Sequence, residues 1–329
     1  MKKITVSLIA EKAQVSPATV SRVLNPRELV KEPTIRRVEE AMRSLGCQIE
    51  NTVTVSKETQ PLIVLNIPGI ENAFYQEIIR GARVSAKAHG CHLLILESHL
   101  NKGNMLDFCN LLRRVDAAGV ILLNRVSEEA LDQIRVIAPL VQCCEYNEHA
   151  DYPYVSIDDT RAAELATEYL LSNGGSKIAL INGPGNFKYA RRRQEGFLNA
   201  LQKAEVMIPK QWIVQLPEVN YEMAYAAVCR LLNSDSRPNA FFTISDVFAA
   251  AVIRAAKRFH LHVPRDILVV GFDNIELSSM TSPSITTVNQ PKFQMGYTAC
   301  EMLLELIEDP QEEMKSLLLD TELVIREST

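Results

Sequence analysis

Residues 61–329 alternate short apolar runs with amphipathic stretches of helical period, and this alternation constrains the fold more than any other feature of the chain. The apolar runs lie at 62–67, 93–97, 119–123, 154–157, 177–181, 212–215, 240–244 and 267–271. Strands that alternate with helices form parallel sheets built from βαβ units. Because the segment is longer than one hydrophobic core usually supports, the pattern predicts an α/β body of two similar lobes.

The first 45 residues predict three short helices instead. These are expected over 6–13, 17–24 and 33–45, with Ser16 as the N-cap of the second helix and Pro17 at its first position. Helical spacing predicts a miniature core of Ile9, Ala10, Val15, Val20, Val23, Val38 and Met42. Residues 47–60 are polar and β-branched, which is typical of a linker. We therefore divide the chain into a head (1–46), a linker (47–60) and a body (61–329).

Charge is distributed unevenly between these parts. The head carries nine Lys/Arg and five Glu, a net charge of +4, whereas the rest of the chain carries 26 basic and 35 acidic residues, a net charge of −9. This asymmetry favours a head that binds a polyanion and a body that does not. Chance is the alternative explanation for so small an excess.

The segment 15–25 has the character of a helix that enters the major groove of DNA. It is short, it follows small residues that let two helices cross closely, and it is rich in small polar groups. Ser16, Thr19 and Ser21 can donate to phosphates, and Arg22 can reach a guanine edge or a phosphate. The predicted DNA-binding residues are Ser16, Pro17, Ala18, Thr19, Ser21, Arg22 and Asn25. A generic three-helix bundle with a solvated polar face is the alternative.

The stretch VSPATVSRVLN at 15–25 resembles the head of the LacI/GalR family of bacterial repressors. The resemblance continues, in order, through FYQEIIRGA, VSIDDTRAAELATEYLLSNG, KIALINGP, RRRQEGFLNAL, TISDVFAAAVIRAAKRFHLHVPRDILVVGFDN, SPSITTVNQP and TELVIREST. The C-terminal half is similar to the cytidine-repressor branch of that family. The resemblance implies a helix-turn-helix head on a periplasmic-binding-protein-like body, with two Rossmann-like lobes and an effector in the cleft between them.

The resemblance also implies effector contacts at the carboxyl ends of strands. The matching residues are Phe74, Tyr75, Asn124, Arg193, Ser245, Asp246 and Asp273. Arg193 opposite Asp273 would suit a neutral polyol such as a sugar or the ribose of a nucleoside. Packing beneath the first body helix is the alternative role for the two aromatic residues. Asp158 is either a cleft residue or a helix N-cap.

Two departures from the family pattern affect the head and linker. The family's hinge segment carries a leucine that wedges into the minor groove, whereas residues 51–56 read Asn-Thr-Val-Thr-Val-Ser. Four of these six residues are β-branched, so we expect weak hinge-helix formation, and a second DNA-bound regulator becomes a candidate partner. Gln14 stands where the family often has Gly; if that site needs a positive φ, Gln costs roughly 1 kcal/mol.

Other classes of protein are disfavoured. The sequence has no nucleophile elbow, P-loop or zinc-protease motif, so we expect no enzyme activity, no catalytic residues and no cofactor. Seven cysteines without ligand spacing indicate reduced thiols and no metal site. No signal peptide or membrane span is evident, which favours a cytoplasmic, nucleoid-associated protein. We expect a homodimeric repressor on a pseudo-palindromic operator; an activator, an effector-independent regulator and a solute-binding protein are the alternatives.

Overall fold

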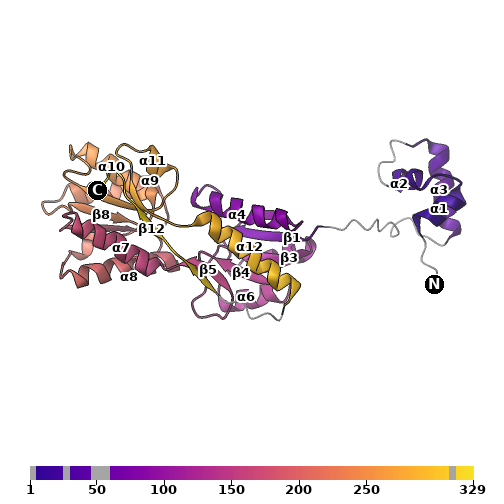
Figure 1. Cartoon of the computed structure of the whole chain (residues 1–329), viewed down its shortest axis with the longest axis horizontal. Helices are drawn as coiled ribbons and strands as arrows, with labels where there is room; N and C mark the ends of the chain where they lie inside the picture. The colour runs from indigo at the N-terminus through magenta and orange to yellow at the C-terminus, as the bar shows by residue number, and fades with distance from the viewer. Residues whose placement is uncertain (1–4, 25–29, 46–59, 311–315) are drawn as a thin grey trace. The chain divides into compact units, whose positions relative to one another are not determined.

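Three short helices form the N-terminal part of the chain in the computed structural model, which describes residues 5–24, 30–45, 60–310 and 316–329 (Figure 1). They are α1 (Val6–Ala13), α2 (Pro17–Leu24) and α3 (Glu32–Ser44), within one unit at Met1–Thr59. The buried side chains of this unit are Ile9, Ala10, Ala13, Val20, Val23, Val38, Ala41 and Met42, with Val15 half-buried beside them. The predicted helices and miniature core are therefore confirmed. The predicted linker, except Gln60, lies outside the described residues.

The turn between α1 and α2 depends on a left-handed residue. Gln14 has φ 53° and ψ 47°, and the N–H of Val15 donates to the carbonyl oxygen of Ala10 at 3.0 Å. This is the hydrogen bond of a Schellman C-cap, in which glycine is the preferred left-handed residue. Position 14 therefore does require a positive φ, and Gln14 adopts this left-handed conformation although it is unfavourable for an L-residue.

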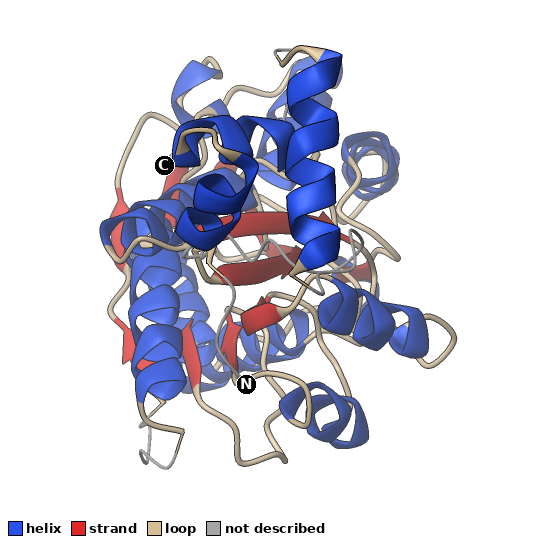
Figure 2. Ribbon diagram, turned by 90° about the vertical axis from the view of Figure 1, so that its right-hand side faces the viewer, coloured by secondary structure: helices blue, strands red, loops and turns tan. Residues whose placement is uncertain are grey.

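The second unit, Gln60–Thr329, contains two six-stranded sheets, each flanked by helices (Figure 2). The sheet of the N-terminal lobe has the order β11-β5-β4-β3-β1-β2. Its strands are β1 (Leu62–Ile67), β2 (His92–Glu97), β3 (Ala117–Leu122), β4 (Leu140–Cys143), β5 (Tyr154–Ile157) and β11 (Leu317–Leu319). All of them pair in parallel. Helices α4 (Phe74–Ala88) and α12 (Lys292–Glu308) pack together on this sheet, and α5 (Met105–Arg114) and α6 (Glu128–Arg135) belong to a separate core cluster.

The sheet of the C-terminal lobe has the corresponding order β12-β10-β9-β8-β6-β7. Its strands are β6 (Ile178–Asn182), β7 (Ile213–Gln215), β8 (Ala240–Thr243), β9 (Leu268–Asp273), β10 (Thr286–Asn289) and β12 (Glu322–Val324). Only β12 pairs antiparallel among the described strands. Four helices pack around this sheet: α7 (Asp159–Ser172), α8 (Lys188–Lys203), α9 (Tyr221–Leu232) and α10 (Asp246–Arg258). Two one-turn helices, η2 (Lys210–Trp212) and α11 (Leu277–Met280), lie in the connections between strands.

The chain crosses between the lobes three times: from β5 to α7, from β10 to α12, and from β11 to β12. Each lobe is therefore assembled from segments far apart in the sequence. Two parallel α/β sheets confirm the predicted fold class, whereas β4, β10, β11 and β12 were not predicted. Each of these four strands has at most four residues, but so do β5, β7 and β8, which were predicted, so length alone does not account for the difference.

Close helix packing in the C-terminal lobe depends on a glycine. A Cβ atom on Gly196 of α8 would overlap the carbonyl oxygen of Thr160 in α7. The pair α7 and α8 is among the most extensively packed helix pairs of the body. This backbone approach brings the third turn of α8 against the first turn of α7, and Arg193, three residues before Gly196, reaches Asp159.

Candidate functional site

The start of α2 is exposed, as a DNA-contacting helix requires. Ser16, Pro17 and Ala18 are exposed and Thr19 is half-buried. The Ser16 Oγ accepts the N–H of Thr19 at 3.1 Å and lies 2.8 Å from the Thr19 Oγ1, so Ser16 caps the helix as predicted. The side chains of Ser21 and Arg22, and the whole of Asn25, lie outside what the structure describes.

Arg193 is the centre of the body's charged site, at the carboxyl ends of the C-terminal lobe's strands. The residue is only 5% exposed. The Nε donates to Asp159 at 2.9 Å, one Nη donates to the carbonyl oxygen of Ile244 at 2.7 Å, and the same Nη lies 3.6 Å from the Oδ1 of Asp273. The guanidinium also lies 3.6 Å from the ring centre of Phe272. Burial would lower the pKa of Arg193, but Asp159 and Asp273 outweigh burial and raise it, so the charge is fixed.

Asp159 joins Arg193 to a second buried cation. The Nζ of Lys188, 2% exposed, donates to Asp159 at 2.7 Å and to the Oγ of Ser156 at 3.0 Å, and it lies over the ring of Tyr146. Burial opposes ionisation of Asp159, but Lys188 and Arg193 outweigh it and lower the pKa of that carboxyl. The adjacent Asp158 accepts the N–H of Arg161 and caps α7, which settles its role as an N-cap.

Asp273 ends β9 beside a third cation, Lys292. Its Oδ1 accepts from Gln290 at 2.7 Å, and Lys292 donates to its backbone carbonyl. Burial outweighs Arg193 and Lys292 and raises the pKa of Asp273. The carboxyl of Asp246 is fully buried; burial first, and then the charge of Asp273, raise its pKa to about 8. Asp246 is therefore mostly protonated at neutral pH.

The two predicted aromatic residues begin α4 in the N-terminal lobe. Phe74 is buried in the core of the body and contacts the ring of Tyr75 edge-on at 5.4 Å. Tyr75 faces groups of both lobes: burial raises its pKa well above the usual range, and Cys144, Tyr189, Glu145 and Asp273 add to the increase. Tyr75 is thus the predicted aromatic residue that lies nearest to the charged site.

Three predicted effector residues have structural partners. The Nδ2 of Asn124 donates to Asn66 and to the carbonyl oxygen of Ser98. Ser245 caps α10 by accepting the N–H of Phe248. The carboxyl of Asp246 accepts from Thr287 at 2.6 Å and from the N–H of Ile275 at 2.8 Å. These hydrogen bonds join the three buried side chains to partners within their own lobes.

Sequence reasoning missed Asp159, Lys188, Glu145, Gln290 and Lys292 as members of this site. Asp159 and Gln290 lie in family-like stretches but were not singled out there, and four separate stretches of chain bring the five residues together. Arg191 and Arg192, interpreted from the sequence as surface charge, are exposed and both pair with Glu148.

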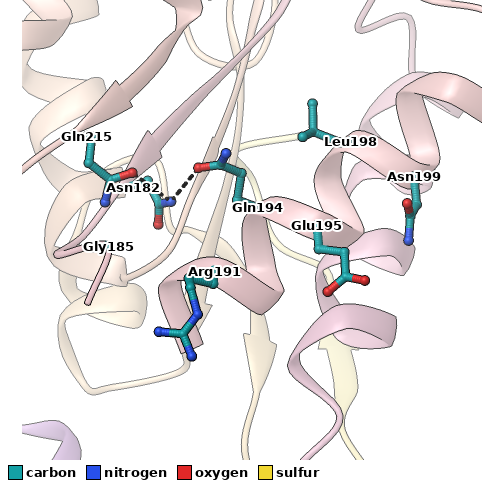
Figure 3. A pocket seen from close by; sticks show the side chains of 8 residues that line it. All are labelled: Asn182, Gly185, Arg191, Gln194, Glu195, Leu198, Asn199 and Gln215. Atoms are coloured by element: carbon teal, nitrogen blue, oxygen red, sulfur yellow. Dashed lines mark hydrogen bonds between the residues drawn. The ribbon is translucent and has the colours of Figure 1, made fainter. Parts of the chain in front are cut away.

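A separate pocket of about 310 Å³ lies along α8 at the ends of β6 and β7 (Figure 3). It is lined by Asn182, Gly185, Arg191, Gln194, Glu195, Leu198, Asn199 and Gln215. The buried Asn182 donates its Nδ2 to the side-chain oxygens of Gln194 and Gln215, at 3.0 and 3.3 Å. None of the predicted effector residues lines this pocket, and no sequence motif predicted it.

Comparisons with known proteins agree with both units. Residues 5–48 match the model for bacterial regulatory proteins of the lacI family, and residues 167–329 match that for the periplasmic binding protein-like domain. The chain is 34% identical to the HTH-type transcriptional repressor CytR of Escherichia coli (strain K12), over 99% of this chain and 96% of that protein. It is 30% identical to catabolite control protein A of Priestia megaterium, over 99% of both chains.

Solved structures of regulators also share the fold. The complex of transcriptional regulator CelR with cellobiose superposes with a TM-score of 0.74 at 26% identity, covering 99% of this chain and 100% of that one. A LacI family transcriptional regulator from Enterococcus faecium with bound ribose gives a TM-score of 0.72 at 26% identity, covering 82% and 98%. No helix among the described residues is long and apolar enough to cross a membrane. The chain belongs to the lacI family of bacterial regulatory proteins: it is a DNA-binding transcriptional regulator with a periplasmic-binding-protein-like effector domain, not an enzyme.

Proposed function

We propose that this regulator is a cytoplasmic repressor whose affinity for its operator is set by a neutral, hydroxyl-bearing small molecule bound between the lobes. The observation that carries the proposal is the buried guanidinium of Arg193 facing the carboxyl of Asp273 at 3.6 Å. A donor fork opposite an acceptor complements vicinal hydroxyls, each of which both donates and accepts. The repressor names of relatives such as CytR support the sign of regulation.

The charge balance of the site supports a neutral effector. Three cations, Arg193, Lys188 and Lys292, share the site with three carboxyls, Asp159, Asp273 and Glu145. With these three carboxyls counted as ionised the formal charges cancel, and Asp246, whose pKa is raised to about 8, adds little. A ligand with a net charge would be buried without compensation, which is strongly unfavourable. A sugar or nucleoside brings no such penalty.

Relatives with carbohydrate ligands support the same class of effector. The CelR structure is a complex with cellobiose and the Enterococcus faecium regulator has bound ribose, both neutral polyols. We assign Tyr75 and Phe74 to the apolar wall, and Arg193 and Asp273 to the polar contacts. We assign Asn124, Ser245 and Asp246 to the support of the cleft wall and not to direct effector contacts, because their polar atoms already bind other protein groups.

For DNA, we assign the contacts to α2 and the residue that follows it. The assigned residues are Ser16, Pro17, Ala18, Thr19, Ser21, Arg22 and Asn25. A homodimer would present two heads to two halves of a pseudo-palindrome. The β-branched segment 51–56 supports a weak hinge helix and assistance from a second DNA-bound regulator. The connector is proposed to span 47–60, between a head at 1–46 and a body at 61–329.

The test has two arms with the full-length protein. Capture and sequencing of bound genomic fragments at near-physiological salt should return sites that share one pseudo-palindrome, and the neighbouring genes should nominate sugars or nucleosides for titration calorimetry. Arg193→Lys and Asp273→Asn should each weaken effector binding at least tenfold, whereas Arg230→Ala, at an exposed position of α9, should not. Unchanged affinity in both cleft variants would refute the assignment of the effector site.

A further inference from the structure

Helix α8, which carries Arg193, receives its N-terminal cap from the other lobe. The residue at its own N-cap position, Phe187, supplies no side-chain hydrogen bond. Instead the carboxylate of Glu145, which follows β4 in the N-terminal lobe, accepts the N–H of Lys188 at 2.9 Å and the N–H of Tyr189 at 3.0 Å. The first amides of a helix and its dipole favour an anion at this place. Here an intrachain carboxylate fills the anion site.

Outer contacts strengthen the same junction between the lobes. Glu148, three residues further along, binds Arg191 at 2.9 Å and Arg192 at 2.6 Å, the fourth and fifth residues of α8. Arg125, from the loop after β3, donates to the carbonyl oxygen of Asn186 just before α8. We call Arg125, Glu145 and Glu148 the interlobe clasp.

The inner and outer parts of the clasp differ in strength. Glu148 pairs with half-exposed arginines, and exposed ion pairs contribute little to stability. Glu145 is only 5% exposed, and it accepts two backbone N–H groups at the start of α8. Charge-assisted hydrogen bonds in such a setting are roughly twice as strong as neutral ones. Glu145 is therefore the member on which the junction mainly depends.

We infer that Glu145 is a positioning residue for the effector site: by capping α8 from the N-terminal lobe, it holds Arg193 in place and keeps the two lobes together before any effector binds. This inference rests on the proposed function for the role of Arg193, but not for the clasp itself. Glu145 anchors α8 at Lys188 and Tyr189, and Arg193 lies one turn further along the same helix. A shift of the first turn would therefore move Arg193 as well. The effector then enters a site that is already assembled, and it needs no anionic group to join the lobes.

Hydrogen exchange of the full-length protein, without DNA or effector, tests the inference. In the wild type the amides of Lys188 and Tyr189 should exchange slowly. Glu145→Ala should speed both at least tenfold, and small-angle scattering should show a larger radius of gyration as the lobes separate. Glu145→Gln, which has the same shape and one remaining acceptor, should give an intermediate effect and guards against misfolding of the alanine variant.

Two matched controls separate the clasp from general loss of a cap or an ion pair. Asn220→Ala removes the cap of α9 within one lobe, at 3.1 Å from the N–H of Met223, and should leave Lys188, Tyr189 and the radius unchanged. Glu195→Gln removes a partner of Arg192 inside the C-terminal lobe, whereas Glu148→Gln removes its partner across the lobes. Only the second should speed exchange at the start of α8.

The outcomes are decisive for the clasp whatever the effector is. Equal exchange of Lys188 and Tyr189 in wild type and both Glu145 variants, or an unchanged radius, would overturn the inference. Faster exchange together with failure of every sugar or nucleoside to bind would support the clasp and refute the proposed effector class.

Discussion

Replacing Gln14 by glycine should stabilise the head by about 0.5–1 kcal/mol. Gln14 holds φ 53° and ψ 47°, and an L-residue pays roughly 1–2 kcal/mol for that left-handed conformation. Glycine adopts it freely but loses more chain entropy on folding, by about 0.5–1 kcal/mol, which offsets part of the gain. The side chain of Gln14 is exposed and can be removed without opening a cavity.

Native-state hydrogen exchange of the intact protein measures this difference directly. The amide of Val15, bonded to Ala10, and that of Val20, in the core of the head, should exchange about 2- to 5-fold more slowly in Gln14→Gly. Gln14→Asn should fall between, because asparagine tolerates the left-handed region, and Gln14→Ala should resemble the wild type. If alanine slowed exchange as much as glycine, the effect would come from loss of the glutamine side chain and the argument from backbone strain would be wrong.

Three further changes test other parts of the molecule. Asp246→Asn should remove a pH dependence of the unfolding free energy. The pKa of Asp246 is raised from 3.8 to about 8, so between these pH values the folded state keeps a proton that the unfolded chain loses. The unfolding free energy of the wild type should therefore fall by up to ~1.4 kcal/mol per pH unit as the pH rises from about 4 to 8. Urea unfolding between pH 5 and 8 should show this slope in the wild type and not in the variant; equal slopes would contradict a raised pKa. Ser16→Ala should destabilise the head by about 1 kcal/mol through loss of the cap, seen as faster exchange at Thr19, and an unchanged rate would mean that the cap contributes nothing. Gly196→Ala should lower the unfolding free energy of the effector domain by roughly 1–3 kcal/mol, because the added methyl must push α8 away from Thr160; a urea midpoint equal to that of the wild type would show that the helices can separate at no cost.

The fold was largely predictable because its signals are local. Each long strand of the two sheets is a continuous apolar run, and each helix of the head begins or ends at a residue with a physical reason to be there. The strands β11 and β12 have three residues each, so their pairing depends on the tertiary structure around them. The antiparallel direction of β12 follows from the last crossing between the lobes, which no local pattern encodes.

The sequence predicted only those residues of the candidate site that belong to a recognisable motif. Arg193 and Asp273 follow recognisable patterns, and the structure places them 3.6 Å apart. Asp159, Lys188 and Glu145 could be assigned to the site only from the structure, which brings α7, α8 and the loop after β4 together. Buried charges such as Lys188 look like surface residues in a sequence, because their burial depends on partners distant in the chain.

The order in which the lobes are completed differs from the order of the sequence. Helix α12 covers β3, β4 and β5 and packs on α4, yet it is synthesised after the whole stretch from α7 to β10. At roughly 5–20 residues per second, a ribosome needs on the order of 10 s to pass from β5 to α12. During that interval the nascent N-terminal lobe exposes the apolar surface that Met295, Ala299 and Leu303 later bury. The sheet of the N-terminal lobe is therefore covered only after most of the C-terminal lobe has been made, and newly made chains should depend on chaperones more than their finished stability would suggest.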